Sequence, residues 1–234
     1  MNIRPIKTRI FREGDTLVTF IEKRIPKLKN GSVLAVTSKI VALAEERVAN
    51  VKDKDQIIRA ESDWALRAKY VWLTLKDGML LANAGADASN ADGKLVLLPE
   101  DSFKAAKKLQ VALKKHYKLK KLGVLITDSR VTPMRSGVVG VALGYAGFKG
   151  LRDYRGKKDI FGRLLRFSGT NIADSLATAA VLVMGEGAEC QPLAIIEGAP
   201  VVFSEKVNRT EVLISAKDDM YGPLFKSVAR KKRL

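Results

Sequence analysis

Acidic side chains next to turn-forming residues occur at three places in this sequence, and each could hold a hard cation. The first is residues 83–90, which read Asn-Ala-Gly-Ala-Asp-Ala-Ser-Asn. Asp87 and Asn90 could bind Mg²⁺ and the phosphates that it bridges, because this ion takes oxygen ligands. The local pattern alone favours the alternative, a loop whose Asn and Asp side chains bond their own backbone.

The second place follows an apolar segment, residues 124–127, and consists of Asp128 and Ser129. Ligands of open α/β sheets collect at the carboxyl ends of strands. A carboxylate beside a hydroxyl at such an end could bind Mg²⁺ or Mn²⁺. A helix N-cap explains the same residues equally well.

The third place is Met184-Gly185-Glu186-Gly187-Ala188-Glu189, after an apolar helical segment. The glycines would let the backbone approach a phosphate closely, and Glu186 could join a metal. The alternative is a glycine C-cap followed by a turn.

Other kinds of chemistry find little support in the sequence. The glycines between positions 137 and 162 match neither the P-loop nor the Rossmann pattern, and close backbone packing explains most of them. One Cys and one His exclude a zinc site built from these residue types. Carboxylates, hydroxyls, amides, lysines and a hard metal remain, and this set suits phosphoryl transfer.

The charge of the chain predicts an anionic ligand. Lys and Arg number 42 against 25 Asp and Glu, which gives a formal net charge of +17. Such a balance attracts nucleic acid, phosphorylated ligands, acidic metabolites or anionic lipid. Eight lysines between positions 104 and 121 have no acid among them; a solvated helix face is the favoured interpretation, and an anion-binding face is the alternative.

The composition is that of a globular protein, with 47% hydrophobic residues over 234 positions. This length fits one large domain or two small ones. No apolar run of membrane-spanning length is present, so we expect no membrane partner. Without a secretory signal at the start, and with Cys190 as the single cysteine, a cytoplasmic location is expected.

Strand-like and helix-like segments alternate, which predicts a mixed α/β or α+β class. We expect helices over residues 16–29, 38–47, 56–75, 102–117 and 172–185, and a last helix that ends in a basic tail at 230–234. Asp15 or Thr16 could cap the first of these helices, Asp101 or Ser102 the fourth, and residues 76–78 are expected to form a turn. Strands are expected within residues 8–12 and over 33–36, 80–82, 95–98, 124–127, 193–196 and 201–203.

Taken together and in this order, the motifs resemble the coenzyme F420-0:gamma-glutamyl ligase family. The resemblance rests on residues 5–7, 36–41, 83–90, 126–129, the glycine series and 184–187, and it extends from about residue 3 to residue 203. It implies an intertwined α/β homodimer of a single two-part domain. It also implies a ligase that uses GTP and Mg²⁺ or Mn²⁺ to join L-glutamate to a carboxylate through an acyl phosphate.

The resemblance further implies roles for individual residues. Asp87 and Asp128 would hold one metal, and Ser129 and Glu186 a second. Arg135 would contact the substrate. The nucleotide would be bound by Ile6, Lys7, Ser38, Lys39, Asn90, Met184, Gly185, Gly187 and Gln191.

Two departures from the family pattern bear on the nucleotide and the acceptor. Leu43 stands where the family has a nucleotide-contacting Lys, and Val131-Thr132 replace a Gly-Arg pair. These changes leave GTP or ATP open and favour an acceptor other than the deazaflavin, such as a folate. One alternative is the coenzyme F420-0:L-glutamate ligase that uses GTP. The other is a non-catalytic nucleic-acid-binding protein, which the retained acids disfavour.

Overall fold

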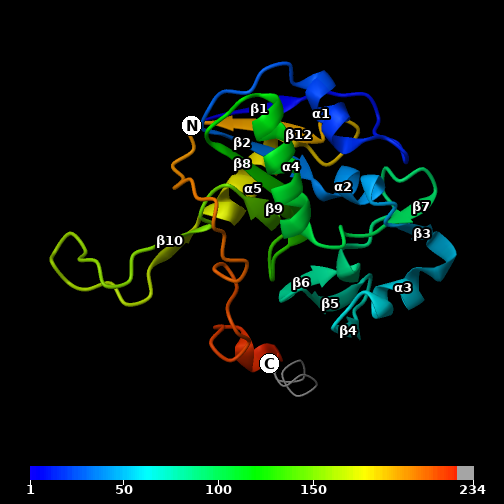
Figure 1. Ribbon diagram of the computed structural model, residues 1–234. Helices are drawn as coiled ribbons and strands as arrows, with labels where there is room; N and C mark the ends of the chain where they lie inside the picture. The colour runs from blue at the N-terminus through cyan, green and yellow to red at the C-terminus, as the bar shows by residue number, and fades with distance from the viewer. Residues whose placement is uncertain (226–234) are drawn as a thin grey trace. The chain divides into compact units, whose positions relative to one another are not determined.

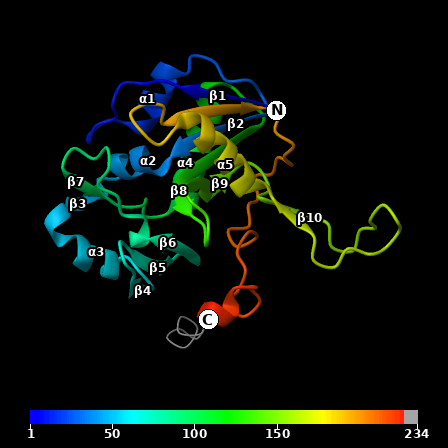
Figure 2. The same ribbon diagram turned by 180° about the vertical axis from the view of Figure 1, so that it is seen from behind.

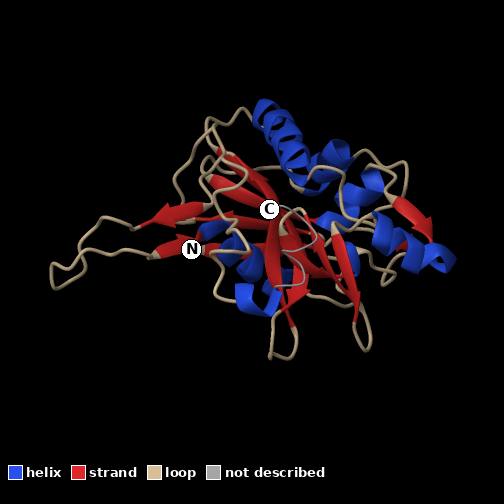
Figure 3. Cartoon of the chain, turned by 90° about the horizontal axis from the view of Figure 1, so that it is seen from below, coloured by secondary structure: helices blue, strands red, loops and turns tan. Residues whose placement is uncertain are grey.

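The computed structural model describes residues 1–225 and shows two compact units. The first unit comprises Met1–Arg47 and Pro99–Glu211; the second comprises Val48–Leu98 and the segment from Val212 onward. Both units combine helices and strands, which confirms the mixed α/β class (Figure 3). The predicted basic tail at 230–234 lies outside the described residues.

A five-stranded sheet forms the centre of the first unit (Figure 1). Its strand order is β1 (Asn2–Ile6), β12 (Leu193–Glu197), β2 (Ser32–Thr37), β8 (Leu122–Val131) and β9 (Val138–Ala146). The pair β2 and β8 is parallel, and the other neighbours are antiparallel. The middle of the sheet is apolar and buried, as its runs of Val, Ile, Leu and Ala predict.

Helices cover both faces of this sheet. On one face lie α4 (Ser102–His116) and α1 (Leu17–Arg24), and on the other lies α5 (Ile172–Met184), which Figure 2 shows from behind. A short helix, α2 (Ser38–Ala44), follows β2 directly. The predicted cap of α4 is confirmed, because Asp101 Oδ1 accepts a hydrogen bond from the Lys104 N–H at 2.8 Å.

Strand β9 contains a bulge opposite the middle of β8. Ile126 pairs with Gly144, but the next residue, Thr127, pairs with Ala142, so Leu143 is one residue too many on its strand. The two flanking glycines consequently face different helices. A side chain built on Gly144 would meet α4, whereas one built on Gly140 would meet α5.

A long two-stranded arm extends from the first unit (Figure 1). Strands β10 (Leu151–Asp153) and β11 (Gly169–Asn171) pair at its base, and residues 154–168 form the rest. Backbone hydrogen bonds such as Gly156 N–H to Leu165 O keep the two sides of the arm together. Its apolar side chains Ile160, Phe161 and Phe167 are about nine-tenths exposed.

The second unit has a small core of its own. It contains β3 (Val48–Asn50), η1 (Val51–Asp53), α3 (Lys54–Ala60), β4 (Trp64–Arg67), β5 (Trp72–Lys76), β6 (Met79–Ala82), η2 (Asn83–Gly85), β7 (Lys94–Val96) and η3 (Gly222–Phe225). Strands β4, β5 and β6 form a meander, and β3 pairs with β7. Ile58, Trp72, Ala86, Leu95 and Leu97 pack together at its centre.

Three predicted elements are wrong. The helix expected over 56–75 ends at Ala60, and strands β4 and β5 occupy the rest of that range. The strand expected within residues 8–12 lies at Asn2–Ile6 instead, where Pro5 is tolerated because β1 is an edge strand. Residues 201–203 form only an isolated bridge, between Phe203 and Phe148.

Two further observations complete the outline of the fold. Asp15 does not cap α1; its carboxylate binds the Arg9 guanidinium at 2.6 Å and the Arg12 N–H at 2.8 Å. Among residues 1–225, the structure contains no helix of the length and apolarity that crossing a membrane requires.

Candidate active site

The predicted site residues of the first unit gather at one edge of its sheet. Strands β2 and β8 run parallel, and their last paired residues are Thr37 and Thr127. The residues that follow are Ser38, which begins α2, and Asp128, which continues β8 and pairs with β9, so both lie just beyond the β2–β8 pairing. This is the carboxyl end of the parallel pairing, the side of a sheet where ligands of α/β proteins bind.

Two antiparallel strands bring further predicted residues to this edge. Ile6 ends β1 opposite Leu193, the first residue of β12. The chain before β12 is held here by two backbone hydrogen bonds, Thr37 N–H to Pro192 O at 3.0 Å and Thr8 N–H to Cys190 O at 2.9 Å. Lys7, Lys39 and Gln191 adjoin these residues in sequence, so they stand at the same edge.

The loop after α5 reaches the end of β8. Ser129 Oγ donates a hydrogen bond to Glu186 Oε2 across 3.2 Å. Gly185, which ends α5, has a φ of +81° and thus adopts a backbone conformation that other residues rarely take. The structure therefore places side by side the two residues that the resemblance assigns to one metal.

Glu189, the last residue of the third predicted place and one without an expected role, shapes this loop. Its Oε2 accepts a hydrogen bond from the Gly187 N–H at 2.8 Å, and a Cβ on Gly185 would collide with its carboxylate. An acid two residues beyond a glycine is a common turn pattern, which was the signal available in the sequence.

Asp128 and Ser129 point toward opposite faces of the sheet. Side chains alternate along a strand, and residues directly opposite on neighbouring strands share a face. Ser129 pairs with Gly140, whose face is covered by α5, whereas Asp128 pairs with Val141. Strand β8 thus contributes Asp128 to one predicted metal-ligand pair from one face and Ser129 to the other pair from the opposite face.

Asp87 and Asn90 belong to the second unit. The backbone of Asp87 exchanges two hydrogen bonds with Val96, and its carboxylate accepts from the Ser89 N–H at 2.8 Å and the Ser89 hydroxyl at 2.5 Å. Asn83 has a structural role, because its Oδ1 accepts from the Trp72 N–H at 3.0 Å. The local bonding of the loop alternative is therefore seen at Asp87, whose carboxylate binds the Ser89 N–H, whereas Asn83 joins the loop to β5.

The remaining predicted positions lie on helix α2 and on the hairpin between β8 and β9. Leu43 lies near the end of α2, and Val131 is the last residue of β8 with 57% of its surface exposed. Arg135 lies in the exposed turn that follows, where its N–H donates to Thr132 O at 3.3 Å. Its side chain is exposed, so it has access to an approaching ligand.

Part of the lysine run has an internal role. Glu205 accepts hydrogen bonds from Lys107 Nζ at 2.7 Å and from Lys114 Nζ at 2.6 Å, and Gln110 lies beside them. These hydrogen bonds lower the pKa of the Glu205 carboxyl from 4.5 to about 2. Two of the eight lysines thus fix the segment after β12 to α4 rather than facing solvent alone.

Comparison with known proteins identifies the kind of enzyme. The profile of the F420-0:Gamma-glutamyl ligase family matches residues 53–198. The chain is 34% identical to the coenzyme F420:L-glutamate ligase of Methanopyrus kandleri, over 85% of this chain and 87% of that protein. It is 35% identical to the Methanocaldococcus jannaschii enzyme of the same name, over 84% of this chain and 80% of that protein.

A third relative matches over a similar share of both chains. The coenzyme F420:L-glutamate ligase of Archaeoglobus fulgidus is 32% identical, over 86% of this chain and 90% of that protein. The α/β fold, the site at the sheet edge and these similarities define a ligase that forms gamma-glutamyl amide bonds. The chain belongs to the F420-0:gamma-glutamyl ligase family, which confirms the resemblance seen in the motifs.

Proposed function

We propose that the protein is a coenzyme F420:L-glutamate ligase, which joins L-glutamate to a deazaflavin acceptor at the expense of a nucleoside triphosphate. The observation that carries this proposal is the similarity to enzymes of that name over most of both chains. The gathering of the predicted residues at the end of β2 and β8 supports it.

The residues at this edge fit a divalent cation. Ligands at adjacent corners of a Mg²⁺ octahedron lie about 2.9 Å apart, since Mg²⁺ binds oxygen at 2.0–2.1 Å. Ser129 Oγ and Glu186 Oε2, at 3.2 Å, are close to this separation. Among residues 1–225 no cluster of three or more His, Cys, Asp or Glu side chains forms a metal site. Water and nucleotide phosphates would therefore complete the coordination, as is usual for Mg²⁺.

The proposed reaction has two steps. A carboxylate oxygen of the acceptor attacks the γ-phosphorus of the nucleotide, the bond to the bridging oxygen breaks, and the nucleoside diphosphate leaves. The amine of L-glutamate then attacks the acyl carbon, loses a proton and displaces phosphate. A bound divalent cation supplies charge neutralisation on the phosphates.

This chain supplies the groups that bind and orient the nucleotide. Lys7 and Lys39 follow β1 and β2 at the edge and bring positive charge to the phosphates. The glycine-containing loop 185–187 brings backbone N–H groups, which approach phosphate oxygens without a side chain between them. Asp128, Ser129 and Glu186 serve as metal ligands from β8 and from the loop after α5.

The deazaflavin acceptor replaces the folate favoured by the sequence departures. The curated relatives are named for coenzyme F420, and they align with this chain over at least four-fifths of its length in the three cases compared. Leu43 and Val131 alter the surroundings of the site but leave its proposed metal ligands in place. Folates remain in the test as competing acceptors.

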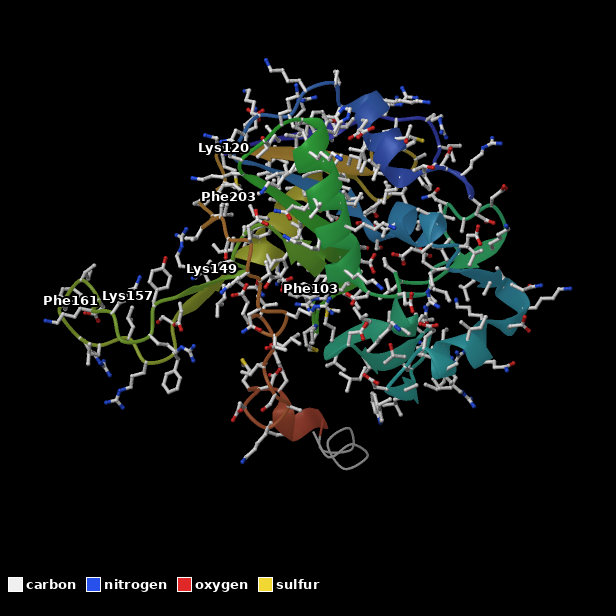
Figure 4. The ribbon with its side chains drawn as sticks, in the orientation of Figure 1. Phe103, Lys120, Lys149, Lys157, Phe161 and Phe203 are labelled. Carbon is white, nitrogen blue, oxygen red and sulfur yellow. The ribbon has the colours of Figure 1, made fainter. Side chains whose placement is uncertain are left out.

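We also propose that the ligase works as a homodimer. The arm exposes Ile160, Phe161 and Phe167, with Phe161 at the end far from β10 (Figure 4). Apolar side chains so exposed on a projecting hairpin are typical of a surface that another chain covers. A second copy of the chain supplies that cover most simply, because two identical arms can each pack on the other protomer.

The net charge of +17 motivates the nucleic-acid alternative, but the contacts of the lysine run weaken it. Lys107 and Lys114 bind Glu205, which reduces the cationic surface that α4 offers to a polyanion.

A ligation assay read by mass spectrometry tests the proposal. The purified chain is mixed with L-glutamate, GTP or ATP, Mg²⁺ or Mn²⁺, and either a deazaflavin acceptor or a panel of folates. We expect the deazaflavin to gain one or more glutamyl units, with an equal amount of nucleoside diphosphate released. Glutamyl transfer to a folate alone would overturn the acceptor, and the absence of any product would overturn the ligation.

Matched variants separate the metal assignment from the fold. Asp128→Asn and Glu186→Gln remove a ligand charge while keeping side-chain volume, and both should abolish turnover with unchanged circular dichroism. Glu13→Gln, in the loop before α1, serves as the control and should retain activity. Full activity in either ligand variant would overturn its metal role.

A further inference from the structure

Helix α5 is fastened to strand β9 by two side chains one turn apart. Asp174 Oδ1 accepts a hydrogen bond from the Ala142 N–H at 2.9 Å, and Thr178 Oγ1 donates to Gly140 O at 2.7 Å. Both bonds join a helix side chain to the strand backbone. They therefore fix the position of the helix along the strand as well as its contact with the face of the sheet.

The contact is close because Gly140 has no side chain. A Cβ at this position would lie 2.4 Å from Ala177 O and 2.8 Å from Thr178 Cα. Backbone atoms cannot yield as a flexible side chain does, so this approach requires glycine. The helix and the strand consequently have one arrangement available at this point.

The two fastened strand residues stand opposite the end of β8. Gly140 pairs with Ser129, and Ala142 pairs with Thr127 on the far side of Asp128. The β9 bulge begins directly after Ala142, and a bulge disturbs the ladder hydrogen bonds beside it. Asp174 therefore supplies a partner for a strand amide at the point where the ladder is irregular.

Asp174 is itself held in place. Its Oδ2 accepts from Asn171 Nδ2 at 2.8 Å, and its N–H donates to Asn171 Oδ1 at 3.0 Å, which caps the helix. The helix then continues without interruption to Met184 and delivers Glu186 two residues later. One rigid element thus connects the β9 backbone opposite Ser129 with the carboxylate that meets Ser129.

We propose that Asp174 and Thr178 are positioning residues that set the spacing between Ser129 and Glu186. Neither touches the proposed metal or nucleotide; they act by locking α5 to the strand that pairs with Ser129. This inference rests on the proposed function, in which Ser129 and Glu186 bind the same cation. Loss of either hydrogen bond is expected to loosen that pair and weaken cation binding without removing a ligand.

Conservative substitutions test this role. Thr178→Val keeps the shape of the side chain and removes the hydroxyl, whereas Thr178→Ser keeps the hydroxyl. Thr178 is exposed, so neither change disturbs the core. We expect Thr178→Val and Asp174→Ala to raise the dissociation constant for Mn²⁺ in the presence of nucleotide about tenfold, within the range measured for residues that orient metal ligands. Thr178→Ser should bind Mn²⁺ with the dissociation constant of the wild type.

Ser175→Ala is the matched control. Ser175 lies between the two residues on the same helix, and its hydroxyl bonds within the helix, to Asn171 O at 2.6 Å. Mn²⁺ binding is read by electron paramagnetic resonance, and hydrogen exchange of the Ala142 amide reports whether the fastening has opened. Unchanged Mn²⁺ binding in Asp174→Ala, with a faster Ala142 amide, would overturn the positioning role, as would unchanged Mn²⁺ binding in Thr178→Val.

The ligand variants distinguish this failure from failure of the proposed function. If Ser129→Ala and Glu186→Gln weaken Mn²⁺ binding but Asp174→Ala and Thr178→Val do not, the positioning inference alone is wrong. If the ligand variants also bind Mn²⁺ normally, the metal assignment itself is wrong, and the positioning inference is overturned with it.

Discussion

Ser129 Oγ and Glu186 Oε2 lie 3.2 Å apart although 57 residues separate them in the chain. Ser129 lies in the partly exposed second half of β8, and Glu186 follows the helix that covers that strand. The separation suits two ligands of one small cation more closely than it suits a strong hydrogen bond to a carboxylate, which is usually shorter. The pair is thus the most specific geometric support for the proposed chemistry.

A hydroxyl at position 129 should be necessary for cation binding, and Ser and Thr should supply it equally well. Ser129→Ala removes an oxygen ligand and is expected to weaken Mn²⁺ binding at least tenfold, whereas Ser129→Thr retains the oxygen and should bind as the wild type does. Isothermal titration with Mn²⁺ and nucleotide measures both. Equal binding by the alanine variant would show that the hydroxyl is not a ligand.

Gly140→Ala should destabilise the first unit because a methyl group would meet the backbone of α5. Overpacking of this kind costs about 2 kcal/mol, which corresponds to a fall in Tm of about 5 °C for a chain of this size. Gly169→Ala is the control, since its Cβ would have its nearest contact at an ordinary 3.5 Å from Leu151. Differential scanning calorimetry should separate the two variants; similar Tm values would contradict the close packing.

A lower pH should weaken the ion pairs that hold the segment after β12 against α4. Lys107 and Lys114 lower the pKa of Glu205 to about 2, so the native state holds this carboxylate charged where the unfolded state, with a pKa of 4.5, takes up a proton. The contribution of Glu205 to stability is therefore present above pH 4.5 and is lost as the pH falls toward 2.

Glu205→Gln tests this pH dependence. The difference in Tm between wild type and variant should be largest near neutral pH and should shrink between pH 4.5 and pH 3, the lowest pH to be measured. Because Glu205 is exposed, the difference should be small, and thermal melts in matched salt are needed to resolve it. A difference that stays constant with pH would refute the role of this ion pair.

Removal of the apolar side chains from the arm should dissociate the proposed dimer. Phe161→Ser together with Phe167→Ser is expected to raise the dimer dissociation constant at least tenfold, because large aromatic side chains commonly dominate interface energies. Sedimentation velocity measures the assembly. Ile10→Ser removes an exposed apolar residue outside the arm and should leave sedimentation unchanged. A monomeric wild type would refute the proposed homodimer.

Much of the first unit could be predicted from local pattern. The apolar run that became β2 and the Asp101 cap of α4 are strong local signals, and both are confirmed. The apolar half of β8 also follows from sequence, but the strand continues through Asp128 and Ser129 to Val131, because these residues pair with β9. These features depend on neighbours in the chain, which the sequence shows directly.

The second unit was harder because its strands are short and partly exposed. Trp64 and Trp72 occupy β4 and β5, but the irregular spacing of apolar residues around them suggested a helix. The turn at Asp77 and Gly78 was visible, and both residues have the positive φ that a tight hairpin needs. The strand before that turn was missed, since its partner β4 lies within the same misread segment.

The fastening of α5 could not be predicted at all. Asp174 and Thr178 have the spacing of neighbours on one helix face, but nothing in the sequence indicates that this face meets backbone. The β9 bulge likewise depends on which residues of β8 it faces. Such features belong to the pairing of distant segments and emerge only in three dimensions.

The position of β12 in the sheet determines when the sheet can be completed during synthesis. Among the described strands, β1 comes first in the chain, yet its sheet neighbour is β12, the strand that comes last. Strand β2 likewise waits for β8 and β12 before its edges are covered. Strand β1 and the apolar strand β2 therefore lack their later partners while the intervening segments are synthesised, a period in which exposed edges favour aggregation. The sheet closes, and the loop 184–191 is anchored, only once Leu193–Glu197 has been made.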